Sequence, residues 1–245
     1  MSNFNLVFFS SSSFVIPIIE SVYAAQHQSL KLVFDKQIQW LRDNHKQFVN
    51  TMPNQWLSFD IENQIQQNSK LDEFLQKQIK LSLIVSQPDR INHSKTVSNP
   101  VVQWARNNQI PLFTPNRINK EINELGVALN GNPIDIAVLA SFGQILSQQV
   151  LEFPAFGFLN WHPSLLPKYR GPTPMQTAIA SGDPITGLSW LEMTKGMDAG
   201  DIWLQMAFQL DTKVTFDQLT TQMAILGANT WSLPIVAKLN YSIGL

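Results

Sequence analysis

Cysteine is absent from the 245 residues of the chain. Its absence excludes disulfide bonds, thiolate ligands for a metal ion and a cysteine nucleophile. A chain without cysteine also fits a reducing compartment, and we expect a cytoplasmic protein. Any catalysis must therefore come from other residue types.

Charged residues are scarce, at 14% of the chain, where about a quarter is usual for a globular protein. Lysine and arginine number 17, aspartate and glutamate number 18, and the net charge is −1. The chain as a whole therefore lacks the excess of basic residues that is typical of a nucleic-acid-binding protein. The composition does not exclude a local basic patch. Hydrophobic residues make up 44%, enough to bury the core of one substantial domain.

Long apolar runs are also missing, since none reaches the roughly 18 residues that a membrane-spanning helix needs. The first 25 residues lack a basic start, and four serines at positions 10–13 interrupt them, so we do not interpret them as a signal peptide. They predict a strand at 5–9, a serine loop in which Ser13 caps a helix, and that helix at 14–26. This order opens a Rossmann-like unit.

Similar patterns recur along the chain. Apolar, β-rich runs predict strands at 80–86, 111–113, 135–141, 187–193 and 201–210, and amphipathic runs predict helices at 100–107 and 120–129. Capping boxes at Thr173/Gln176 and Thr215/Gln218 predict two further helix starts, the second opening a last helix that Pro234 could kink. The predicted fold class is α/β, a Rossmann-like open, mostly parallel sheet with helices on both faces.

Two polar residues end an apolar run late in the chain. Asn160 and His162 alternate along the expected strand, so their side chains share one face, and a glycine-flanked loop supplies Asp198. Histidine could accept the proton of an attacking amine, and an amide N–H could stabilise the oxyanion of a tetrahedral intermediate. The pattern indicates chemistry on a carbonyl carbon. Each piece alone is also typical of a strand end or a turn.

The order of motifs in this region carries a resemblance. Asn160-x-His162-x-Ser164-Leu165-Leu166-Pro167 is followed by Tyr169-Arg170-Gly171 and then by Asp198-x-Gly200-Asp201. This set resembles the formyltransferase family that uses 10-formyltetrahydrofolate. The resemblance implies that fold, that folate as co-substrate, and Asn160, His162 and Asp198 as catalytic residues. No metal is implied, because no histidine pair stands at ligand spacing.

The resemblance also implies two folate-binding loops. Their residues are Phe142, Gly143, Gln144, Ile145 and Leu146 in the first loop, and Ser164, Leu165, Leu166 and Pro167 in the second.

The likeness is greatest to the branch of the family that formylates methionyl-tRNA in translation initiation. Residues 14–20 resemble its first helix, and Gln87-Pro88-Asp89-Arg90 resembles the turn before its tRNA-gripping loop. The resemblance implies methionylated initiator tRNA as a partner, with substrate-binding residues Ser10, Ser11, Arg90, Lys95 and Arg170.

Three departures keep other acceptors open. The loop after Arg90 has few cations, although each phosphate contact needs one. We expect no C-terminal β-barrel domain of the kind usual in that branch. Serine stands at positions 10 and 11 where the branch usually has glycine, and a loop that needs positive φ would be strained. An amino-sugar nucleotide is the alternative acceptor, followed by glycinamide ribonucleotide, and a non-catalytic folate-binding relative is a further alternative.

Residues 27–78 stand outside the resemblance. They are rich in glutamine, asparagine and lysine and predict helices at 30–48 and 61–78. We interpret them as a helical insertion within one catalytic domain that spans residues 1–245. A solvated helical hairpin packed on the domain edge is favoured, and a partner-binding or oligomerising element is the alternative.

Overall fold

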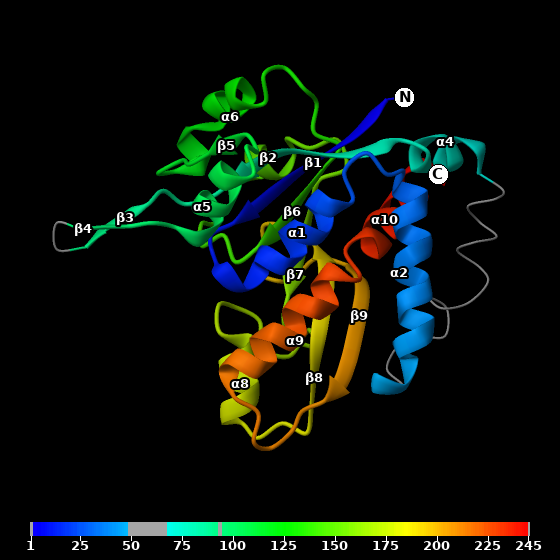
Figure 1. The fold of residues 1–245 in the computed structure, drawn as a ribbon, viewed down its shortest axis with the longest axis vertical. Helices are drawn as coiled ribbons and strands as arrows, with labels where there is room; N and C mark the ends of the chain where they lie inside the picture. The colour runs from blue at the N-terminus through cyan, green and yellow to red at the C-terminus, as the bar shows by residue number, and fades with distance from the viewer. Residues whose placement is uncertain (1, 49–67, 93–94, 245) are drawn as a thin grey trace.

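A seven-stranded sheet organises the computed structural model, which describes residues 2–48, 68–92 and 95–244 (Figure 1). The first five strands across the sheet pair in parallel. The sixth strand pairs antiparallel with the fifth, and the seventh pairs antiparallel with the sixth. The prediction of an open, mostly parallel sheet is confirmed. The order across the sheet is β5 (Leu112–Phe113), β2 (Gln78–Val85), β1 (Asn3–Ser10), β6 (Ile136–Ala140), β7 (Phe158–His162), β8 (Ile185–Glu192) and β9 (Ile202–Gln209).

Helices cover both faces of this sheet, as predicted. One layer holds α1 (Ile16–Ala24), α2 (Leu30–Asn44), α4 (Ser69–Leu75), α5 (Pro100–Asn107), α8 (Pro174–Ala180), α9 (Phe216–Ala228) and α10 (Ser232–Gly244). The opposite layer holds α6 (Ile122–Ala128) and α7 (Gln148–Leu151). Short 3-10 helices are η1 (Ser13–Val15), η2 (His45–Gln47) and η3 (Ile118–Lys120). A hairpin of β3 (Arg90–Asn92) and β4 (Lys95–Val97) extends away from the body (Figure 1).

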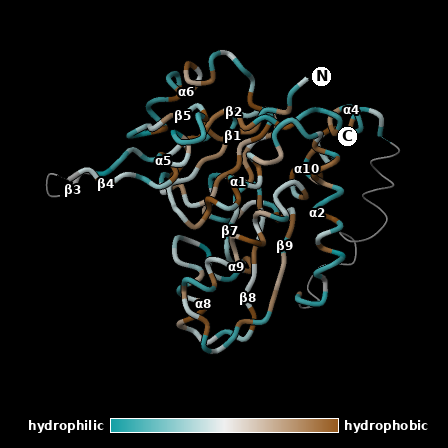
Figure 2. Tube along the Cα trace, viewed as in Figure 1, coloured by the Kyte–Doolittle hydropathy of each residue, from teal (hydrophilic) through white to brown (hydrophobic). Residues whose placement is uncertain are grey.

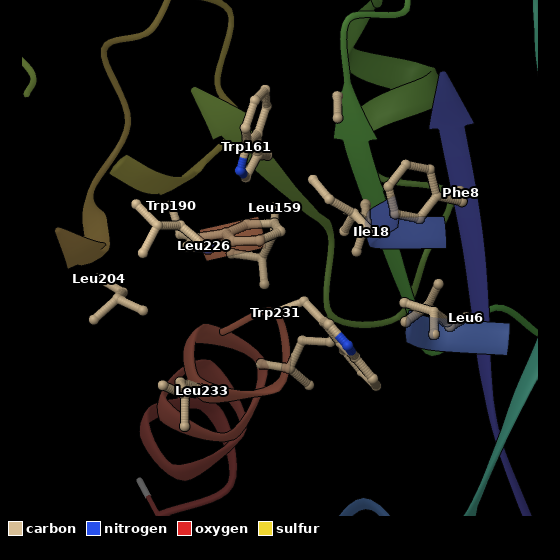
Figure 3. Close-up of a cluster of buried hydrophobic side chains, with 14 of the residues drawn as sticks. Leu6, Phe8, Ile18, Leu159, Trp161, Trp190, Leu204, Leu226, Trp231 and Leu233 are labelled. Carbon is tan, nitrogen blue, oxygen red and sulfur yellow. The ribbon is translucent and has the colours of Figure 1, made fainter. Parts of the chain in front are cut away.

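Alternation of side chains along the strands divides the core into two clusters. In β1, Leu6 and Phe8 face the larger helical layer, whereas Val7 faces the layer of α6 and α7. Figure 3 shows the larger cluster, in which Trp161 and Trp231 fill the space between the sheet and the helices. Hydrophobic residues gather in the central strands, whereas hydrophilic and hydrophobic residues alternate along α2 (Figure 2). Among the described residues, no helix is both long and apolar enough to cross a membrane.

The predicted strand, loop and helix at the start of the chain are present, but the cap differs. Ser13 begins η1, so Ser12 takes the cap position, and its side chain makes no capping bond. Neither Ser10 nor Ser11 adopts positive φ. Serine in this loop therefore causes no backbone strain, and that departure from the family pattern needs no compensation.

The end of the chain differs from the single kinked helix that we expected. Helix α9 ends at Ala228 and α10 begins at Ser232, with the fully buried Trp231 between them. Pro234 lies in the first turn of α10, where a missing N–H leaves no helical bond unmade, so it does not kink the helix.

One of the two predicted capping boxes forms. Thr215 and Gln218 make both reciprocal bonds at the start of α9. Thr173 makes no side-chain capping bond before α8, because its backbone (φ −129°, ψ 46°) is not in the extended region that a capping residue needs.

Helix α2, which lies in the predicted insertion, packs against α10 and α4, and a buried polar contact ties it to α10. The Gln37 amide donates to Ala228 O at 3.3 Å and accepts from Ser232 N at 2.9 Å and from Ser232 Oγ at 2.8 Å. It therefore joins α2 to the junction of α9 and α10. The second predicted helix appears as α4, and residues 61–67 of that prediction lie outside the described residues.

Candidate active site

Strand β7 carries two polar side chains at its carboxyl end, on one face of the sheet. Phe158, Asn160 and His162 share the face of α6 and α7, while Leu159 and Trp161 point into the opposite cluster. Asn160 is 8% exposed and His162 is 5% exposed. Ligands of open parallel sheets bind beyond the carboxyl ends of the strands, and both residues lie at such an end.

Asp198 joins these two residues from the loop between β8 and β9. Its Oδ1 accepts from Asn160 Nδ2 at 3.1 Å, and its Oδ2 accepts from Gly171 N at 2.8 Å. The same Oδ2 lies 3.7 Å from His162 Nδ1. The fold thus brings together the three residues that the sequence singled out.

The tautomer of His162 follows from its second contact. Nε2 lies 2.9 Å from Tyr169 O, and a carbonyl can only accept, so Nε2 carries the hydrogen. In the neutral ring Nδ1 is then the basic nitrogen, and it faces Asp198. A positive charge gained at Nδ1 would be stabilised by that carboxylate.

The segment after β7 shapes this site through its backbone. Tyr169 has φ 57° and Gly171 has φ 95°, and these turns aim one carbonyl at His162 and one N–H at Asp198. The sequence motif contained Tyr169 and Gly171, but it gave them no role, because backbone contacts leave no residue-type signal.

An ion pair lies beside this segment. Lys168 Nζ lies 2.8 Å from Asp183 Oδ2, and this hydrogen bond lowers the pKa of Asp183.

A cavity of about 220 Å³ lies against Asn160 and Asp198. The predicted loop residues Gln144, Ile145 and Leu146 form one wall, and Ile145 is 81% exposed at its rim. The opposite wall was missed by sequence reasoning and consists of Leu191, Glu192, Met193, Thr194, Lys195, Gly196 and Met197, with Leu139 also lining the space. Their position next to the Asp198 motif was the available signal.

Other residues of the two predicted folate loops lie away from this cavity. Phe142 is 1% exposed and packs edge-on against Phe9, so a ligand cannot reach its side chain. Gly143 is exposed with φ 81°, and a Cβ there would lie 2.5 Å from Gln87 Nε2.

The second loop is held in the fold through its own polar groups. Ser164 is 1% exposed and donates to Lys168 O, and Leu166 is 6% exposed with its N–H bonded to Ser189 Oγ. The prediction that Ser164 and Leu166 belong to a folate-binding loop stays a prediction, and their burial leaves their side chains little exposed surface for a ligand. Leu165 is half-buried and Pro167 is exposed, and neither lines the cavity.

The predicted substrate-binding residues divide into buried and exposed positions. The Ser10 side chain is fully buried, and its part in substrate binding stays a prediction. Ser11 Oγ accepts from Gln87 N at 2.9 Å and donates to Phe142 O at 3.2 Å, which ties together three strand ends.

The cationic residues of that prediction lie on the surface where the structure describes them. Arg90 is exposed at the start of the β3–β4 hairpin, and Arg170 is exposed beside the site. The side chain of Lys95 lies outside the described part of the structure.

Comparison with known proteins gives a family match. A family model described as formyl transferase matches residues 58–234. Over 162 residues the chain is 35% identical to the methionyl-tRNA formyltransferase of Prochlorococcus marinus (strain MIT 9312), covering 65% of this chain and 49% of that one. Over 145 residues it is 40% identical to the enzyme of the same name from Fervidobacterium nodosum, covering 58% and 45%. The chain thus spans about half the length of these curated relatives.

Solved structures show the same fold. The phosphoribosylglycinamide formyltransferase of Bacillus halodurans superposes with a TM-score of 0.59 at 18% identity, covering 97% of this chain and 94% of that one. The phosphoribosylglycinamide formyltransferase of Anaplasma phagocytophilum superposes with a TM-score of 0.60 at 16% identity, covering 94% and 83%.

Proposed function

The chain belongs to the formyl transferase family, and from this premise we propose that it transfers the formyl group of 10-formyltetrahydrofolate to the amino group of methionyl-tRNA. One observation carries the proposal. Asn160 and Asp198 bond to each other at the wall of a cavity, and Asp198 Oδ2 lies 3.7 Å from His162 Nδ1, so amide, carboxylate and imidazole are grouped beside a space where a formyl carbon could sit.

The donor would occupy the cavity beside Asn160. Ile145 and Leu146 give that cavity apolar surface with an exposed rim, which suits a flat heteroaromatic ring, and Gln144 lies beside them. Asn160 Nδ2 has two hydrogens and donates one to Asp198, so the other can donate to the formyl oxygen.

The reaction then follows from the geometry. The amine nitrogen attacks the formyl carbon, and His162 Nδ1 accepts a proton from it. Asn160 stabilises the oxyanion, and Asp198 stabilises the imidazolium. Collapse of the intermediate breaks the bond between the formyl carbon and N10 of the folate. The proton that His162 accepted then passes to N10 through Asp198 or water.

Methionyl-tRNA is the proposed acceptor because the curated relatives that match at 33–40% identity carry that name. The exposed Arg90 and Arg170 supply cations for a phosphate backbone.

A formyl-transfer assay tests the proposal with 10-formyltetrahydrofolate and, in separate tubes, methionylated initiator tRNA, amino-sugar nucleotides and glycinamide ribonucleotide. We expect formylation of the tRNA and a loss of about 10³-fold in kcat for His162→Ala. His27→Asn is the matched control, because His27 is exposed at the opposite end of the strands and asparagine tolerates its φ of 66°.

The other outcomes contradict the proposal in different ways. Transfer only to a sugar or ribonucleotide would overturn the acceptor. Binding of tetrahydrofolate without any transfer would overturn the enzyme and leave a folate-binding relative.

A further inference from the structure

Lys238 is a nearly inaccessible lysine on the last helix, α10. The residue is 5% exposed, its Nζ lies 2.8 Å from Glu192 Oε1, and the same atom lies 5.4 Å from the centre of the Trp203 ring. Lysine is seldom so buried unless it is paired. One carboxylate and one aromatic face therefore hold this ammonium group in place of water.

Glu192 stands where β8 ends and the loop that carries Asp198 begins. Its N–H donates to Asp201 O at 2.8 Å across the base of the loop. A Cβ on Gly200 would lie 1.9 Å from Glu192 O, so the two ends of the loop are in direct backbone contact. Any shift of Glu192 would therefore move the loop at its base.

The wall formed by residues 192–195 has open space on both sides. One side is the cavity of about 220 Å³ beside Asn160, and the other is a polar cavity of about 610 Å³ that Lys238 also lines. Within this wall, Met193 is held by packing against the smaller core cluster and by its N–H, which donates to Phe158 O at 3.1 Å. The ion pair with Lys238 holds the side chain of Glu192, the first residue of the wall.

We propose that Lys238 is a positioning residue for the loop of residues 193–200, and through it for Asp198 and the donor cavity; this rests on the proposed function. Lys238 is buried but the Glu192 side chain is 34% exposed, so desolvation of the one and solvent screening of the other leave the pair little net stability. The main consequence of the pair is then geometric, in the placement of Asp198 against Asn160.

Steady-state kinetics of Lys238→Met test the proposal. The 10-formyltetrahydrofolate concentration is varied, and the assay temperature is kept well below the Tm of each variant. We expect the KM for the donor to rise about tenfold while the KM for the acceptor is unchanged, since this wall lines the cavity in which we propose that the donor binds. Lys238→Arg restores part of the loss, because it keeps the charge.

Leu239→Ala is the matched control for stability. Leu239 is the next residue of the same helix and is fully buried in the core. We expect it to lower the Tm at least as much as Lys238→Met while keeping the KM for the donor. A lower Tm with unchanged kinetic constants in Lys238→Met would overturn the proposal.

Hydrogen exchange separates this proposal from the proposed function. Amides of residues 193–200 should exchange faster in Lys238→Met and not in Leu239→Ala, with no substrate present. If the wild type transfers no formyl group but this difference is seen, only the proposed function fails. Equal exchange of the loop in Lys238→Met and wild type would overturn the positioning role, whatever the assay shows.

Discussion

Two buried polar clusters in this chain use similar groups in opposite ways. At the junction cluster, Gln37 of α2 meets Ala228 and Ser232, and its amide both donates and accepts at 2.8–3.3 Å. At the catalytic cluster, Asn160 and His162 meet Asp198, but His162 Nδ1 stays 3.7 Å from the carboxylate. The first cluster is closed, whereas the second borders a cavity.

This difference gives a criterion that distinguishes a polar cluster that stabilises the fold from one that can catalyse a reaction. A satisfied buried network rigidifies the fold, because any rearrangement leaves a polar group unpaired. A network with spare donors and acceptors beside a cavity can bind a substrate and move a proton. By this criterion we expect Gln37 to contribute stability, and we expect Asn160 and His162 at the end of β7 to contribute to the proposed chemistry.

Asp198→Asn should have the largest effect, and it acts on catalysis. Asparagine keeps the size of the side chain but cannot stabilise the imidazolium, and its single acceptor oxygen can serve only one of the two donors, Asn160 Nδ2 and Gly171 N, so we expect kcat to fall about 10³-fold with a modest fall in Tm. Kinetics and thermal denaturation check this. A large fall in Tm with modest loss of kcat would show that the catalytic cluster is structural after all.

Gln37→Ala should have the next largest effect, and it acts on stability. Removal of the amide leaves the N–H and hydroxyl of Ser232 unpaired, whereas Ala228 O keeps its bond from Ser21 Oγ, so we expect about 2 kcal/mol less free energy of unfolding. Urea denaturation measures this change. Kinetic constants should be retained.

Gln39→Ala is the matched control for that change. Gln39 lies on the same helix but is exposed, and it bonds only to the exposed Asp43 among the described residues. We expect a change within about 0.5 kcal/mol. Equal losses in the two variants would contradict the closed-cluster interpretation of Gln37.

Asp183→Asn should have the smallest effect, and its effect depends on pH. The hydrogen bond from Lys168 lowers the pKa of Asp183 from its ordinary value of 3.8, so the carboxylate is stabilised in the folded state. That stability is fully present above pH 3.8 and is lost as the pH falls through the lower folded pKa. The difference in Tm between wild type and variant should therefore shrink below pH 3.8. A difference that is constant from pH 7 to below this point would contradict the assignment.

The catalytic cluster was largely predictable from sequence. Alternation along β7 placed Asn160 and His162 on one face, and the order of motifs supplied Asp198. The roles of these residues remain predictions until the variants are measured. The Thr215 cap and the parallel strands were equally predictable, because period and capping are local signals.

The errors arose where a local signal competed with a long-range contact. Thr173 has the sequence of a capping residue, but the turns before α8 fix its backbone elsewhere. The last helix divides because Trp231 is buried in the core and Gln37 bonds to the start of α10.

The sequence by itself determined the strand and helix order, the polar residues at the end of β7 and the family likeness, because each is written in neighbouring residues. Only the tertiary structure decided which polar groups are satisfied and which face open space. That choice depends on partners far apart in the chain, such as Lys238 with Glu192 and Gln37 with Ser232. Hydrogen bonds and burial depend on which residues lie close in space, and no local sequence pattern encodes that proximity.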